Sequence, residues 1–220
     1  MNPNLTEIAY VLDRSGSMQP LTEAAITGFN DFLQQQLDEP GDANLSLMLF
    51  DNEFLTPHIR TPLQDVRGLD AGSYVPRGCT ALLDAIGLTI DELGKRLAAE
   101  PEERRPGKVI VAIYTDGYEN ASTCYTLEKI NQMITHQRKH YDWDFMFLAA
   151  NQDAIATAAQ MGIARDMASV SDHSAKGMHS AHHAFSRKMK SIRQEMRTGE
   201  KDADYDKPME EVVKEEEGRD

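Results

Sequence analysis

The chain has 220 residues, of which 40% are hydrophobic and 27% charged, and these proportions exclude a fibrous or wholly disordered chain. The formal net charge of −13 argues against nonspecific attraction to nucleic acid or anionic lipid, because both are polyanions. No apolar run approaches the roughly 18 residues of a membrane-spanning helix, and the N-terminus lacks an apolar signal segment. We therefore expect a cytoplasmic protein with no nucleic-acid or membrane partner, whose Cys79 and Cys124 are reduced thiols.

The first predicted element is a buried strand at residues 8–12, which ends in a polar loop. Residues 21–37 carry apolar side chains at helical spacing, and a proline and a glycine follow the last of them, so we predict a helix there. Residues 44–50 and 54–59 are β-prone runs separated by three polar residues. This pattern predicts an antiparallel hairpin whose second strand lies at the edge of a sheet.

The middle of the chain repeats the order of loop, helix and strand. Residues 66–78 are rich in Gly, Pro, Asp and Arg, and we expect this loop to deliver Thr80 to the start of a helix at 82–97. Residues 109–115 then form a nearly unbroken apolar run. Such aliphatic density is typical of a central parallel strand that is covered on both faces.

The alternation continues in the second half of the chain. We predict a helix at residues 127–141, a strand at 143–150, a helix at 153–161 and a short last strand at 167–170. This order predicts an α/β fold of the Rossmann-like, doubly wound type. Its mostly parallel central sheet would have one antiparallel edge strand and helices on both faces.

The C-terminal part differs in composition from the rest. An apolar stripe of Met, Phe and Ile predicts a long amphipathic helix at residues 173–198, packed on or extending a main domain at 1–172. Residues 199–220 carry ten acidic and four basic side chains and lose this periodicity. We therefore expect an acidic disordered tail, with some helical tendency at 209–217.

Two carboxylates and several hydroxyls are predicted to meet at one edge of the sheet. Asp13 and Asp116 each directly follow a buried strand, and ligands of doubly wound sheets bind at the carboxyl ends of strands. The hydroxyls of Ser15 and Ser17 accompany Asp13. Such hard oxygen donors suit Mg²⁺, Mn²⁺ or Ca²⁺, and neutral hydroxyls leave part of the ion's charge for an incoming carboxylate. The alternative is that these residues only cap a helix and form a turn.

The same residues resemble a known family motif. Asp13-Arg-Ser15-Gly-Ser17 resembles the first motif of the metal-ion-dependent adhesion site of von Willebrand factor A (vWA) domains. Thr80, in Gly-Cys-Thr-Ala-Leu-Leu-Asp, resembles the second-loop threonine of that family, and Asp116, in Tyr-Thr-Asp-Gly, resembles its third-loop aspartate. The resemblance implies a vWA domain of the intracellular bacterial type. It also implies that the two serines, and often the threonine, bind the metal directly, while the aspartates often act through water.

The predicted function follows from this resemblance and from the oxygen-rich site. We expect a metal-dependent protein-binding module without catalysis, which captures a Glu or Asp of a partner protein as an adaptor or accessory subunit of an intracellular complex. One alternative is a metal-dependent hydrolase or phosphotransferase, but Ser15 stands where a phosphoaspartate enzyme needs a second acid. Another is an adaptor that hands substrates to an ATPase, as some intracellular relatives of the family do.

Other polar residues leave alternatives open. Cys79 stands where the family commonly has glycine, and we expect it to pack as a small buried group. Arg14 and Arg77 either steer an acidic partner or are solvated loop residues. Three histidines of the C-terminal helix form either a polar helix face, which we favour, or a transition-metal site: His179, His182 and His183.

Overall fold

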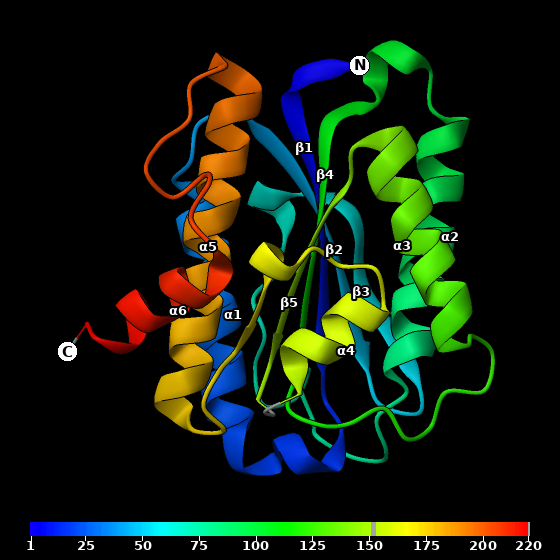
Figure 1. The fold of residues 1–220 in the computed structure, drawn as a ribbon, viewed down its shortest axis with the longest axis vertical. Helices are drawn as coiled ribbons and strands as arrows, with labels where there is room; N and C mark the ends of the chain where they lie inside the picture. Colours follow the sequence, from blue (N-terminus) through cyan, green and yellow to red (C-terminus); the bar gives the residue numbers. More distant parts are fainter. Residues whose placement is uncertain (151–152, 220) are drawn as a thin grey trace.

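A six-stranded sheet forms the centre of the protein (Figure 1). The computed structural model describes residues 1–150 and 153–219. The strand order is β3-β2-β1-β4-β5-β6, and every neighbouring pair is parallel except β2 and β3, which are antiparallel. The strands are β1 (Asn2–Asp13), β2 (Asp42–Phe50), β3 (Phe54–Pro62), β4 (Pro106–Thr115), β5 (Asp144–Ala149) and β6 (Ala168–Val170).

Helices cover both faces of the sheet, with α1, α5 and α6 on one side and α2, α3 and α4 on the other (Figure 1). The longer helices are α1 (Thr22–Leu37), α2 (Leu82–Ala99), α3 (Leu127–Tyr141), α4 (Ala154–Gln160), α5 (Ala175–Thr198) and α6 (Met209–Glu217). Short 3₁₀ helices lie in the connections: η1 (Gly16–Leu21), η2 (Leu63–Asp65), η3 (Glu102–Arg104) and η4 (Arg165–Met167). Within the described ranges, no helix has both the length and the apolar character needed to cross a bilayer.

The central strands are apolar on both faces because each face meets a layer of helices. In β1, Ile8, Tyr10 and Leu12 belong to the core under α1 and α5, whereas Ala9 and Val11 belong to the core under α2 and α3. The same two-sided burial explains the unbroken apolar run of β4. The edge strand β3 is largely exposed or half-buried, as its mixed composition predicts.

The chain order creates a switch point beside β1. The connection through α1 leads from β1 to β2 on one side, whereas β4 lies on the other side of β1. Leu12 lies opposite Tyr114, so Asp13 and Asp116 leave the sheet at the same edge. Ligands of doubly wound folds bind in the crevice at such a point.

The sequence predictions are confirmed for the fold class, including the antiparallel edge strand. The first strand is longer than expected, since β1 begins at Asn2 rather than at residue 8. Helix α5 packs along α1. The division into a main domain at 1–172 and a helical appendage stays a prediction.

The structure corrects the expectation of a disordered tail at residues 199–220, of which Asp220 lies outside the described residues. Residues 209–217 form α6, and its Met209, Val212 and Val213 are buried in the core beneath α1 and α5. The acidic charge of this segment is balanced from α5, because Arg187 pairs with several of its carboxylates. The buried side chains of α6 and the ion pairs of Arg187 thus fix in place a segment that its composition alone predicts to be disordered.

Candidate metal site

The loop after β1 is fixed to the loop before α2 by two main-chain hydrogen bonds. The amide of Gly16 donates to the carbonyl of Gly78 over 3.1 Å, and the amide of Arg77 donates to the carbonyl of Arg14 over 2.8 Å. Gly78 has a φ of +66°, a left-handed conformation that favours glycine. The glycine therefore lets the second loop turn back along the first.

The loop before α2 is also fixed to the loop after β4. Thr80 donates its amide to Asn120 Oδ1 over 2.9 Å, and the amide of Asn120 donates to the carbonyl of Thr80 over 3.0 Å. A Cβ atom placed on Gly117 would lie 3.1 Å from Thr80 Oγ1 and 3.6 Å from Ser17 Oγ. The absence of a side chain at Gly117 thus allows the three loops to approach one another closely.

The predicted site residues come together where these loops meet. Ser15 Oγ lies 3.1 Å from Ser17 Oγ, and Ser17 Oγ donates to Asp116 Oδ1 over 2.7 Å. Asp13 Oδ1 accepts the amide hydrogen of Ser15 over 2.6 Å. With Thr80 Oγ1 beside Gly117, two carboxylates and three hydroxyls face one region at the carboxyl edge of the sheet.

Asp13 is fully buried at the end of β1. Thr115 Oγ1 donates to its Oδ2 over 2.5 Å, and Tyr74 OH donates to its main-chain carbonyl over 2.5 Å. Burial raises the pKa of Asp13 to about 6, although the hydrogen bonds from Thr115 and Ser15 oppose this rise. Among the described residues, no lysine, arginine or histidine lies within ion-pair distance of Asp13, so its charge has no basic partner.

This set of side chains fits a hard divalent cation. All the donors are oxygens, and the carboxylates of Asp13 and Asp116 supply negative charge in a mostly buried place. In the part of the chain that the structure describes, Thr80 Oγ1 takes part in no hydrogen bond, which leaves its lone pairs for another ligand. The arrangement could hold an ion from one side and leave the other side open.

Two functional neighbours of the site were missed by sequence reasoning. His173, between β6 and α5, places Nε2 3.0 Å from Asp116 Oδ2. No local pattern predicts this contact, because the two residues are far apart in the chain. Thr115 donates to Asp13 and directly precedes Asp116 in the chain. Its position at the end of a predicted strand could have identified it as a neighbour of the site.

Arg14 is buried, so the expectation that it is a solvated loop residue is wrong, whereas its role in steering a partner stays a prediction. Its side chain is 4% exposed, and its Nη2 lies 3.1 Å from Oδ2 of the fully buried Asp51. Arg77 Nε lies 3.0 Å from the same oxygen. The contact of Arg14 is an ion pair without hydrogen-bond alignment, because its Nε and Nη2 have no hydrogen-bond partner among the described residues. Asp51 directly follows β2, whereas Asp13 is the last residue of β1, and the role of Asp51 is to hold two arginines.

Cys79 is exposed, which corrects the expectation that it packs as a small buried group. Its amide donates to Asn52 Oδ1 over 3.3 Å, and this holds the backbone while the thiol points out of the core. Cys124 is exposed as well, and both thiols are free, as predicted.

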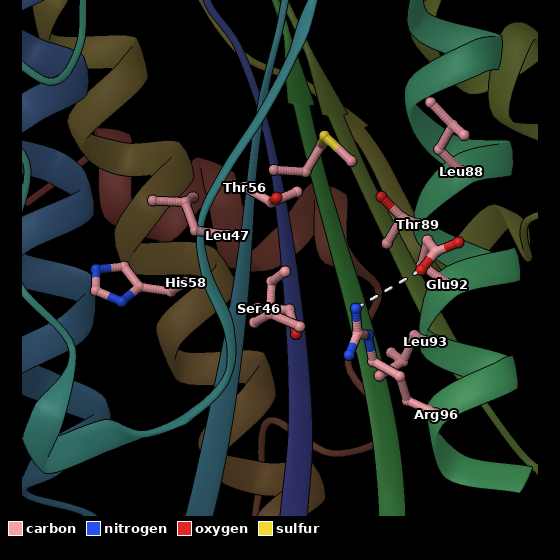
Figure 2. Close-up of a pocket in the computed structure, with 11 residues that line it drawn as sticks. Ser46, Leu47, Thr56, His58, Leu88, Thr89, Glu92, Leu93 and Arg96 are labelled. Atoms are coloured by element: carbon pink, nitrogen blue, oxygen red, sulfur yellow. Dashed lines mark ion pairs between the residues drawn. The ribbon is translucent and has the colours of Figure 1, made fainter. Parts of the chain in front are cut away.

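A separate pocket of about 300 Å³ lies between β2, β3 and α2, and none of the five predicted site residues lines it. Figure 2 shows Thr89 and Leu93 on α2 and Thr56 on β3 among the side chains that line it. Glu92 is the carboxylate in its lining, and it forms an ion pair of 3.7 Å with Arg96. This pocket therefore offers no set of metal-binding groups.

Known structures share the fold of this chain. No model of a known protein family and no curated protein matches the sequence. One similar solved structure is proximal thread matrix protein 1 of the mussel byssus, with a zinc-occupied metal-ion-dependent adhesion-site motif. It is 14% identical, with a TM-score of 0.56, and the match covers 81% of this chain and 46% of that one. Manganese-loaded TRAP protein of Plasmodium vivax is 15% identical, with a TM-score of 0.52 and coverage of 78% and 70%.

A third similar structure, von Willebrand factor type A from Catenulispora acidiphila, is 12% identical, with a TM-score of 0.53 and coverage of 84% of this chain and 42% of that one. This chain thus spans less than half the length of the mussel and Catenulispora proteins. The likeness is one of fold, and the chain has the vWA fold.

Gly78→Ala is expected to lower the free energy of unfolding by about 2 kcal/mol or more, because a left-handed non-glycine residue costs about 1–2 kcal/mol. The new Cβ would also lie 2.0 Å from Asn52 Oδ1, which accepts the amide hydrogen of Cys79. Urea denaturation measures the change. Gly199→Ala is the matched control, since Gly199 has a φ of +72° but no atom within 4 Å of the position that a Cβ would take. If both variants lose the same free energy of unfolding, the contact between the new Cβ and Asn52 adds no cost to the substitution at Gly78.

Proposed function

We propose that this protein is a divalent-metal-dependent protein-binding module. Asp13, Ser15, Ser17, Thr80 and Asp116 would hold Mg²⁺, or Mn²⁺ or Ca²⁺, and the ion would capture an acidic residue of a partner protein. The observation that carries the proposal is the convergence of two buried carboxylates and three hydroxyls from three loops, with no basic residue paired to Asp13 within the described ranges. The vWA fold, known in metal-loaded neighbours, supports it.

The chemistry of the donor set supports capture rather than catalysis. A bound ion would supply an electrophilic point for a carboxylate of the partner. The hydroxyls of Ser15, Ser17 and Thr80 are neutral ligands, so they leave positive charge on the ion for that carboxylate. The Nε2–H of His173 donates to Asp116 Oδ2, and His173 would orient this carboxylate rather than activate a nucleophile.

Two exposed side chains that lie close in the chain to residues of the site support a protein as the partner. Tyr118, two residues after Asp116, is 60% exposed, and Val75, next to Tyr74, is 49% exposed. Aromatic side chains dominate the binding energy of many protein interfaces. An acidic side chain on the metal, with an apolar contact to Tyr118 and Val75 beside it, would bind a folded partner better than a free small acid.

The test is affinity capture of the full chain from a cell extract with Mg²⁺ or with a chelator. We expect a partner that is retained with Mg²⁺, released by the chelator and absent with Asp13→Ala. If Asp13→Ala loses metal binding and keeps the partner, metal-dependent capture is wrong. The same preparation can be assayed on phosphoesters, and metal-dependent turnover that Asp116→Ala abolishes would favour the hydrolase alternative.

Tyr118→Ala is expected to weaken binding of the captured partner by about tenfold, as truncation of a central interface tyrosine does. Metal affinity should stay unchanged, because the phenol is not a ligand of the proposed ion. Tyr141→Ala is the matched control, since Tyr141 is 61% exposed at the end of α3 and outside the site. Calorimetry with the purified partner measures both variants, and equal losses would remove Tyr118 from the proposed surface.

We further propose an adaptor role in an intracellular complex, with an ATPase as one candidate subunit. The acidic charge of the chain and its free thiols agree with an intracellular location. Identification of the chelator-sensitive partner tests the proposal directly. A partner drawn only from the extracellular matrix would contradict it.

A further inference from the structure

The three histidines of α5 do not share one environment. His182 is fully buried, and Tyr10 OH lies 2.6 Å from its Nδ1. Gly28 of α1 makes room for the ring, because a Cβ there would lie 2.4 Å from His182 Cδ2. Burial lowers the pKa of His182 to about 3, so the ring is neutral and belongs to the core. The expectation that all three histidines form a polar face is wrong for this residue.

The other two histidines are partly exposed and face α1. His179 and His183 are separated by one helical turn, and their ring centroids lie 5.6 Å apart. Asp31 of α1 joins them, with Oδ2 3.7 Å from His179 Nε2. One nitrogen of each histidine and one carboxylate oxygen of Asp31 all lie within 4.8 Å of one another. The carboxylate that the local sequence lacks thus comes from another helix.

Helix α6 adds a second carboxylate next to this cluster. Glu216 Oε2 lies 3.9 Å from His183 Nδ1, while its Oε1 is held by Arg187 at 2.6 Å. A pocket of about 370 Å³ opens there, with Lys176 and Arg219 also in its lining. The two cations lower the local affinity for a metal ion, but Arg219 already pairs with Glu216 Oε1 over 2.7 Å, and the carboxylate of Asp31 adds negative charge at the site.

We propose that His179, His183 and Asp31 form a second metal site, for a borderline transition-metal ion such as Zn²⁺. Two imidazoles at i and i+4 on one helix face, completed by a carboxylate, are a ligand set that Zn²⁺ prefers. Bonds of about 2.0–2.1 Å require ligand atoms roughly 3.3 Å apart around a tetrahedral ion. Rotation of the three partly exposed side chains closes the present separations to this value, and water fills the fourth position.

The two sites differ in the ions they select. The site at the strand ends offers oxygen donors only, whereas the α1–α5 site offers two imidazole nitrogens. A metal at the second site would join α1, which follows the first metal loop, to α5, which follows His173. The inference rests on geometry separate from the first site and stands or falls independently of the proposed function.

The test is a Zn²⁺ titration of the full chain against a chromophoric chelator, in an Asp13→Asn background that weakens the first site. We expect one equivalent of Zn²⁺ to bind. His179→Ala with His183→Ala should abolish this binding, and Asp31→Asn should raise the Kd at least about tenfold, because even loss of an outer-shell partner costs about 10–100-fold.

The matched control is His136→Ala with His140→Ala, on α3. These histidines have the same i, i+4 spacing and ring centroids 4.6 Å apart, but no third ligating group completes the pair among the described residues. Their removal should leave the binding unchanged. Absence of Zn²⁺ binding, or binding that survives removal of His179 and His183, would overturn the proposal. If that double variant is unfolded by circular dichroism, the single change Asp31→Asn decides, and an unchanged Kd overturns it.

Discussion

Without a divalent metal, Asp13→Asn is expected to increase the free energy of unfolding at pH 7 by about 2–3 kcal/mol. The carboxyl group of Asp13 is fully buried, and burial raises its pKa from 3.8 to about 6. At pH 7 the ionised carboxylate is therefore less stable in the folded protein than in the unfolded chain, and this difference lowers the free energy of unfolding of the wild type. An amide keeps an oxygen for the Ser15 amide, and the Thr115 hydroxyl can rotate to accept from its NH₂ group. The same change should remove the stabilisation by Mg²⁺, which urea denaturation with and without the ion measures.

The pH dependence of this difference follows from the direction of the pKa shift. Between pH about 4 and 6, the folded wild type binds more protons at Asp13 than the unfolded chain does, so this group's contribution to stability falls as pH rises. The advantage of the asparagine variant should therefore grow from pH 4 to 6 and stay constant above. The exposed Asp38→Asn serves as the control for loss of one charge. A variant that is less stable than wild type at pH 7 would contradict the burial argument.

Val212→Asp is expected to lower the free energy of unfolding by about 3–5 kcal/mol, because it places a carboxylate in an apolar core. Val212 is fully buried in α6, in the same core cluster as Met209 and Phe185. Lys214, the lysine of α6, is exposed and already pairs with Glu210 over 2.6 Å, so it lies outside the core that receives the new charge. Equilibrium unfolding in urea measures the loss.

The matched control for this change is Val75→Asp, because Val75 is 49% exposed. An exposed substitution of this kind changes stability by about 0.5 kcal/mol or less. If Val212→Asp is as mild as Val75→Asp, the last turns of the chain do not pack on the body. The sequence-based expectation of a disordered tail would then be restored.

The candidate site could be predicted because its residues carry local signals. Asp13 and Asp116 each end a strong apolar run, and Thr80 opens an apolar helix after a Gly-rich loop. In a parallel sheet, the position of a strand end in the sequence also gives its position in space. The fold class was predictable for the same reason, since the alternation of elements limits how they can be layered.

The contacts between distant residues could not be predicted in this way. The burial of Arg14 depends on Asp51 at the end of another strand, and the contact of His173 with Asp116 depends on where β6 ends. The sequence shows that each of these residues is polar, but it does not show which charge lies opposite. The exposure of the Cys79 side chain could not be predicted either. It depends on a contact with another loop, in which Asn52 accepts the amide hydrogen of Cys79.

The order of the tail could not be predicted from its net charge. Met209, Val212 and Val213 follow helical spacing, but they are surrounded by glutamates, whose charge predicts disorder. Arg187 of α5 accounts for the difference, since it contacts carboxylates before and within α6. Net charge describes a segment as a whole, whereas its stability depends on which side chains its charged residues pair with in the folded protein.

The three loops of the candidate metal site are joined mainly through backbone atoms. The bonds from Gly16 to Gly78, from Arg77 to Arg14 and from Asn120 to Thr80 do not involve a metal-facing side chain as donor or acceptor. Much of the frame of the site is therefore separate from its ligands, and the bond from Ser17 to Asp116 is a contact between two ligands. Natural drift or deliberate redesign can exchange a hydroxyl for a carboxylate, and so retune the preferred ion, without rebuilding the scaffold that presents it.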